Sequence, residues 1–246
     1  MTYQEFLQTL NKAYRNSPEL VSLVKQIAKA ADKGKATYEM AQKYAVALGK
    51  ILGKTINETG VLSDEQFEYS VEYVARILRP ALKKTYDLSS DAATMVQESI
   101  NKSHGVNLKP IKPKVDNDRI DNLIKEIANR GYTEDEEKYR HQFENLNQSA
   151  VDKTMYDNGD FLEHTGVTVT YTRIAESGAC KWCRSMAGTY STHEAPDGFF
   201  ARHTNCNCYI KVNSMVATGT VNAWTKAYDR AVREGRVKDA LNEEES

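Results

Sequence analysis

The sequence predicts an α+β protein that is mainly α-helical. It would have a long helical N-terminal part, a small antiparallel β zinc-binding module and a C-terminal helix. Three observations carry this prediction. Apolar residues recur at helical spacing through most of the chain up to His164. Residues 167–174 alternate β-branched or aromatic side chains with others, as a strand does. All four cysteines lie close together in the sequence, between Cys180 and Cys208.

Helix signals follow one another through residues 1–103. Ser17 can cap a helix that Pro18 begins, because the missing N–H of proline costs nothing at the first helical position. Apolar residues of this helix, Val24 among them, form a stripe that we expect to face the core. A third helix fits residues 36–52, with Gly53 as its end.

Two further helices are expected before residue 103. A capping box at Ser63 opens a helix that runs toward Tyr86. Pro80 should kink this helix or end it early. A short helix then begins at Ser90 and ends near Ser103.

The second half of the chain changes in character. Residues 116–130 predict a helix ended by Gly131, and a capping box at Thr133 opens a long polar helix to about Asn158. The apolar positions of this helix are sparse, so we expect one narrow buried face. Strands are predicted at 167–174, 188–191 and 208–212. The predicted units are 1–103 (helical domain), 104–115 (extended linker), 116–164 (helical arm), 165–214 (β-rich Cys/His zinc module) and 215–246 (C-terminal helix and acidic tail).

Composition excludes several classes of protein. The 246 residues contain 33 Lys and Arg against 34 Asp and Glu, a balance that argues against a protein built as a whole to coat nucleic acid. No apolar run is long enough to predict a membrane span, and we expect no secretory signal at the N-terminus. Residues 1–54, however, carry nine basic and four acidic side chains. They either contact DNA or are solvated helix faces, and the candidates for DNA contact are Lys25, Lys29, Lys33 and Lys35.

The cysteines form a pattern typical of a zinc site. Cys180 and Cys183 are separated by two residues, a spacing that lets the backbone curl around one ion. Further along the chain come His203, Cys206 and Cys208. Zinc takes four ligands in a tetrahedron, so these five candidates leave one over, and the spacing does not decide whether it is His203, Cys206 or Cys208. With only Cys and His available, we expect a closed structural zinc site.

Disulfides, a redox pair and a deaminase site fit the cysteines less well. Disulfides are unexpected without a secretion signal, because the cytosol keeps thiols reduced. A thioredoxin-like pair needs a βαβ setting and would leave two cysteines unexplained. A zinc deaminase needs its histidine motif before the C-x-x-C pair, whereas His193 follows Cys183 here.

We expect no catalytic residues and therefore no enzyme. His104, His141, His164 and His193 are scattered, and each is expected at the surface. Near the end of the polar helix stands a polar cluster that is either a solvated helix end or a metal site: Asp157, Asp160, Glu163 and His164.

The cysteine region resembles a family of phage proteins. Residues 172–183, then Gly188-Thr189-Tyr190, then residues 202–208 are similar to the minor head proteins of tailed bacteriophages, which include the phage Mu F-like head morphogenesis proteins. The motif covers about residues 165–212, and the helical remainder matches only in type. The F-like form usually has prolines around the histidine. This chain has Ala201, Arg202 and Thr204 there, which favours the minor capsid type of phages that infect Gram-positive bacteria.

This resemblance implies a non-enzymatic minor structural protein of the phage head. Such a protein associates with the portal and the major capsid protein and aids head morphogenesis, DNA packaging or DNA ejection. It would be located in the virion, and in the host cytoplasm during assembly, with phage DNA as a further partner and no small-molecule substrate. The alternative is a cytosolic zinc-ribbon protein that binds nucleic acid, although residues 173–212 carry only two more basic than acidic residues.

Overall fold

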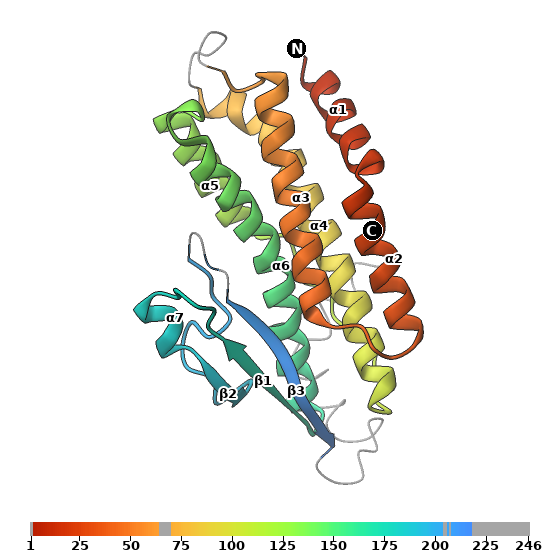
Figure 1. The fold of residues 1–246 in the computed structure, drawn as a ribbon. Helices are drawn as coiled ribbons and strands as arrows, with labels where there is room; N and C mark the ends of the chain where they lie inside the picture. Colours follow the sequence, from red (N-terminus) through yellow and green to blue (C-terminus); the bar gives the residue numbers. More distant parts are fainter. Residues whose placement is uncertain (1, 64–69, 204–205, 207, 218–246) are drawn as a thin grey trace.

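The computed structural model describes residues 2–63, 70–203, 206 and 208–217. It confirms a mainly helical α+β fold with a small antiparallel sheet. The helices form a bundle, and the sheet lies against one side of it (Figure 1). The helices are α1 (Tyr3–Asn16), α2 (Pro18–Asp32), α3 (Tyr38–Thr59), α4 (Val71–Ser103), α5 (Asn117–Arg130), α6 (Glu136–His164) and α7 (Lys181–Ser185). The strands are β1 (Val167–Ile174), β2 (Gly188–Ser191) and β3 (Tyr209–Ala217).

Helix α2 begins as its sequence predicts. Ser17 accepts a hydrogen bond from the Leu20 N–H, and Pro18 is the first helical residue. The predicted apolar stripe is only partly correct, because Leu20 and Ile27 are buried whereas Val24 is 47% exposed. The outer part of the stripe therefore faces solvent.

Helix α3 does not end at Gly53, as predicted, but continues to Thr59. Gly60 ends it in the left-handed conformation, with φ 60°. Gly49 and Gly53 lie within the helix, where the absence of a side chain allows close packing against α6. A Cβ on Gly49 would lie 2.6 Å from the backbone N of Glu144, so glycine allows α6 to approach closely.

Helix α4 is one continuous helix of 33 residues, so the predicted interruption between Tyr86 and Ser90 is wrong. The helix passes through Pro80 and begins at Val71, with Ser70 as its N-cap. The long buried face of α4 stabilises it against α3, α5 and α6, and this packing outweighs the local cost of a proline. Most of the capping box predicted at Ser63 lies outside the described residues.

Helix α6 is the central helix of the bundle and not a polar arm with one narrow buried face. It packs against α3, α4, α5 and β1, and its polar residues are therefore buried together with its apolar ones. Buried Asn147 donates a hydrogen bond to the Ala45 carbonyl of α3. Asn158 holds the backbone of Ile111 through two hydrogen bonds of 2.8 Å. The non-helical segment before α5 is thereby fixed to α6. The predicted boundary between two domains at residues 104–115 stays a prediction.

The sheet has the order β2-β1-β3, with antiparallel pairing throughout. In β1, Val167, Val169, Tyr171 and Arg173 alternate with half-buried residues and form the buried face. The Tyr171 hydroxyl donates to the Met155 carbonyl of α6, which joins the sheet to the central helix. Side chains of the helices and of the sheet belong to one hydrophobic core.

The predicted C-terminal unit begins at residue 215, but residues 215–217 belong to β3, which continues to Ala217. The rest of the predicted C-terminal helix and acidic tail, residues 218–246, lies outside the described residues. Within the part of the chain that is described, no helix combines the length and the apolar character that a membrane span requires.

Candidate metal centre

A tight turn holds the first two cysteines of the candidate site. Cys180 is the N-cap of the short helix α7, and its Sγ accepts a hydrogen bond of 3.4 Å from the Cys183 N–H. Gly178 precedes it with φ 83°, a conformation that glycine adopts without strain. Cys180 is exposed and Cys183 is buried, so the pair reaches from the surface into the interior.

A second turn holds the other candidates. The His203 carbonyl accepts a hydrogen bond of 3.2 Å from the Cys206 N–H. The same carbonyl accepts another of 3.0 Å from the Asn145 side chain of α6. Cys206 and Cys208 are both 3% exposed, and Cys208 immediately precedes β3. The turn is therefore attached to the central helix at one end and to the sheet at the other.

The two turns meet with their ligand atoms together. His203 Nε2 lies 3.4 Å from Cys180 Sγ and 2.8 Å from Cys183 Sγ, and Cys183 Sγ lies 3.7 Å from Cys206 Sγ. The ligand atoms form two groups of three, and within each group they lie no more than 4.8 Å apart. One group is Cys180, Cys183 and His203, and the other is Cys183, Cys206 and Cys208. Cys183 belongs to both groups and is the centre of the site.

These distances suit a tetrahedral ion. A zinc ion at about 2.3 Å from sulfur and 2.0–2.1 Å from nitrogen places two sulfurs about 3.8 Å apart, and a sulfur and a nitrogen about 3.6 Å apart. The distances from Cys183 to Cys206 and from Cys180 to His203 are close to these values. The shorter contact from Cys183 to His203 requires the imidazole to move outward by less than about 1 Å. The five predicted residues thus form two overlapping groups of three candidate ligands that share Cys183.

The two thiols of the first turn differ electrostatically. Burial, reinforced by the thiols of Cys208 and Cys206, raises the pKa of Cys183 to about 12. Hydrogen bonding to the backbone N–H of Cys183 lowers the pKa of Cys180, which is exposed. A metal ion binds thiolates, so binding at Cys183 releases a proton and weakens as the pH falls.

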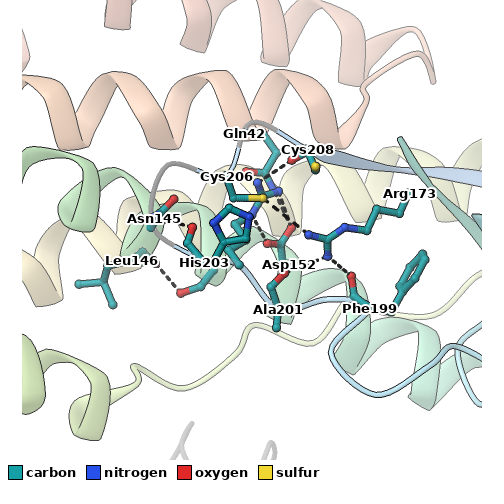
Figure 2. Close-up of polar contacts among 12 residues, drawn as sticks. Gln42, Asn145, Leu146, Asp152, Arg173, Phe199, Ala201, His203, Cys206 and Cys208 are labelled. Atoms are coloured by element: carbon teal, nitrogen blue, oxygen red, sulfur yellow. Dashed lines mark hydrogen bonds and ion pairs between the residues drawn. The ribbon is translucent and has the colours of Figure 1, made fainter. Parts of the chain in front are cut away.

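Arg173 is part of the site, although the spacing of the Cys and His ligands gives it no role there. The alternation of β1 puts this arginine on the buried face, where it is 2% exposed. Its guanidinium donates to the carbonyls of Phe199 and Ala201 and lies 3.6 Å from Cys206 Sγ (Figure 2). The guanidinium also lies over the Trp182 ring, 5.2 Å from its centroid. Arg173 therefore fixes the loop before His203 and places a positive charge beside the sulfurs.

Arg202 connects the site to the helical bundle. It forms a buried ion pair with Asp152 of α6 and donates a hydrogen bond of 2.7 Å to the Cys208 carbonyl. Asp152 also accepts a hydrogen bond of 2.7 Å from Gln42 of α3, as Figure 2 shows. Only the fold reveals these partners, because Asp152 and Arg202 are 50 residues apart in sequence.

The four candidate DNA-contacting lysines lie elsewhere. Lys25 and Lys29 belong to α2, and Lys33 and Lys35 to the turn after it; all four are exposed. Helix α2 lies on the side of the bundle away from the sheet (Figure 1). The lysines and the Cys/His site are therefore separate features of the molecule.

Comparison with known proteins identifies a family. The family described as VG15 protein, a viral (phage) protein family, matches residues 28–231. No matching curated protein and no matching solved structure was found. The matched range contains α3 to α7, the three strands and all five candidate ligands. The chain therefore belongs to the VG15 protein family, a family of phage proteins.

Proposed function

We propose that this protein is a minor structural protein of the phage head. It would associate with the portal and the major capsid protein and aid head morphogenesis, DNA packaging or DNA ejection. The observation that carries the proposal is the match to a phage family over residues 28–231, a range that includes both the helical bundle from α3 onward and the Cys/His module. The resemblance of the cysteine motif to minor head proteins supports the finer assignment.

The proposed ligands of the metal are Cys180, Cys183, His203 and Cys206, with zinc as the ion. Each pair of ligands has two residues between its members and a hydrogen bond that links them: the Cys183 N–H donates to Cys180 Sγ, and the Cys206 N–H donates to the His203 carbonyl. Cys208 is the fifth candidate and lies beyond the second turn. Four protein ligands leave no coordination position for a substrate water, so the proposed zinc is structural and the proposed role is not enzymatic.

Zinc would stabilise a part of the molecule that has little apolar packing of its own. Among the described residues, buried Cys183, Cys206 and Cys208 form a small cluster apart from the main core, with Ala175 and Ala179 packed against it. Helix α7 has five residues, too few for an isolated helix to be stable in water. A metal ion would hold α7 and the loop before β3 against the helical bundle.

The alternative is a zinc-ribbon protein that binds nucleic acid, and the charges of the module argue against it. Arg173 and Arg202 are two of the few basic residues there, but both side chains are buried and hydrogen-bonded within the protein. They are therefore not available to phosphate groups. The exposed lysines of α2 and the following turn are the better candidates for contact with phage DNA.

Quantitative mass spectrometry of phage particles tests the proposal. The protein would be measured in DNA-filled heads, in ghosts after DNA release and in free cytosol. A minor head protein is enriched in full heads at a few copies per particle, and an ejected one is lost from ghosts. A protein that stays in the cytosol contradicts the proposal. A salt titration of DNA binding then tests the zinc-ribbon alternative. A zinc-ribbon binder loses its DNA affinity when the Cys/His module is altered, and it keeps that affinity when Lys25 and Lys29 are replaced.

A further inference from the structure

A second group of candidate metal ligands lies at the far end of α6. Asp160 and His164 are four residues apart on this helix, and His193 lies in the turn after β2. The ligand atoms of the three residues lie within 4.8 Å of one another. The rings of His164 and His193 meet edge to face, with centroids 5.2 Å apart. The fold thus brings two imidazoles and a carboxylate together from separate parts of the sequence.

The hydrogen bonds of His164 define its tautomer. Its Nδ1 lies 2.6 Å from the Asp160 carbonyl oxygen, which can only accept. Nδ1 therefore carries the proton, and Nε2 carries the lone pair in the neutral ring. Metal-bound histidines typically have this arrangement, in which one nitrogen donates to a carbonyl or carboxylate and the other binds the ion.

The His193 ring lies between two carboxylates. Its Nδ1 lies 3.0 Å from Glu163 Oε2, and the side chain of Glu163 is only 9% exposed. Glu163 is itself held by the N–H groups of Thr192 and His193, so its carboxylate is fixed toward the ring. The His193 ring thus has Nδ1 on the side of Glu163 and Nε2 on the side of Asp160.

His193 and Asp160 lie close enough to bind one ion. Nε2 of His193 lies 3.0 Å from Asp160 Oδ1, a carboxylate atom that only accepts. Without a metal, Nε2 donates its proton to this oxygen, and a bound ion would take the place of that proton. A spacing of 3.0 Å suits two ligands at about 2.0–2.1 Å from one ion.

We propose that Asp160, His164 and His193 bind a divalent transition-metal ion, with Glu163 as the residue that orients His193. Two imidazoles and one carboxylate suit zinc, nickel or copper better than magnesium or calcium. The side chain of His193 is 51% exposed, so ions can reach the site from solvent. The ion would clamp the turn after β2 to the last turns of α6. The site is separate from the Cys/His centre, and the proposal does not depend on that centre.

Equilibrium dialysis against buffered free Zn²⁺ tests the proposal, with bound metal measured by mass spectrometry. The wild-type chain is compared with His164→Ala, His193→Ala and Asp160→Asn at neutral pH. We expect the wild-type chain to bind one more equivalent of Zn²⁺ than the alanine variants do, or to bind it at least about tenfold more tightly. Helical circular dichroism verifies that each variant is folded; His193→Ala alters an exposed turn residue and should not disturb the core.

His141→Ala is the matched control. His141 lies on the same helix, 3.7 Å from the carboxylate of Glu137 and 3.5 Å from that of Glu144. Within the described parts of the chain it belongs to no group of three clustered ligands, so we expect this variant to bind Zn²⁺ as the wild-type chain does. Titration with Co²⁺ gives a second readout, because thiolate charge-transfer absorption marks ions at the cysteines and is absent from ions bound by His and Asp. If His164→Ala and His193→Ala bind as much metal as the wild-type chain at every free concentration, the contact of His193 with Asp160 is a hydrogen bond within the protein and the proposal is wrong.

Discussion

Arg202 and Asp152 form an ion pair in which both side chains are only 2% exposed. The pair joins the loop of the Cys/His module to the central helix α6, and Gln42 extends the connection to α3. A charge buried this deeply is tolerated only with its partner and additional hydrogen bonds. The pair therefore fixes how the module sits on the helical bundle.

Removing one partner of this pair should destabilise the protein strongly. Asp152→Ala leaves the Arg202 guanidinium buried without its counter-charge, and we expect a loss of about 3–5 kcal/mol in the free energy of unfolding. Urea unfolding followed by circular dichroism measures this. Glu39→Ala is the control, since it breaks an exposed pair with Lys43 and should cost less than about 1 kcal/mol. Equal losses of unfolding free energy in the two variants would show that the buried pair stabilises the protein no more than the exposed pair does.

The close approach of α3 and α6 at Gly49 gives a second prediction. A Cβ on this residue would lie 2.6 Å from the backbone N of Glu144, which cannot move away without displacing α6. Gly49→Ala should therefore cost about 1–3 kcal/mol, although alanine is the better helix former. In Gly53→Ala the new Cβ would lie 3.1 Å from Arg140 Cγ and 3.2 Å from Arg140 Cβ, a contact that a shift of a few tenths of an ångström relieves, so we expect a smaller loss than in Gly49→Ala. Thermal unfolding of the two variants tests this, and a neutral Gly49→Ala contradicts the packing described.

The proposed ligand set predicts different results at two neighbouring cysteines. Cys206→Ser removes a proposed ligand and should weaken zinc binding strongly, because serine does not replace a thiolate. Cys208→Ser should retain one tightly bound zinc. Competition with a chromophoric chelator measures both affinities. Loss of zinc from Cys208→Ser with retention in Cys206→Ser would reverse the assignment.

A pH dependence follows from the pair of Glu126 and Lys138, which connects α5 to α6. The hydrogen bond from Lys138 lowers the pKa of Glu126 in the folded protein. A lowered carboxyl pKa stabilises the fold fully above the unfolded pKa of about 4.3, and this contribution is lost as the pH falls through the lower folded value. Lys138→Met should therefore be less stable than the wild-type chain at pH 7, by at most about 1 kcal/mol. The two unfolding free energies should converge in acid; a constant difference down to low pH would contradict this.

The local patterns of the sequence were sufficient for some elements. Strict alternation located β1, Ser17 and Pro18 located the start of α2, and Gly131 located the end of α5. Helix α6 was misjudged, because many of its polar residues have their partners on other elements. Asn147 and Asn158 are examples, since their hydrogen bonds to Ala45 and Ile111 depend on tertiary packing.

The candidate sites were likewise predictable only where local sequence spacing determines them. The spacing of the cysteines and His203 predicted their convergence, because the local turns supply the ligands in pairs. Arg173 could not be identified, since its role follows from the face of β1 on which it lies. The polar cluster near the end of α6 was recognised in sequence, but His193 joins it only through the turn after β2.

X-ray absorption at the zinc edge tests whether one ion, held by both turns, joins the β module to the helical bundle. The sample is the His193→Ala protein loaded with one equivalent of Zn²⁺, so that the second proposed site does not compete for the metal. We predict three sulfur ligands at about 2.3 Å and one nitrogen ligand at about 2.0–2.1 Å. A shell of oxygen and nitrogen atoms with no sulfur would show that the cysteines do not hold the ion and would contradict this prediction.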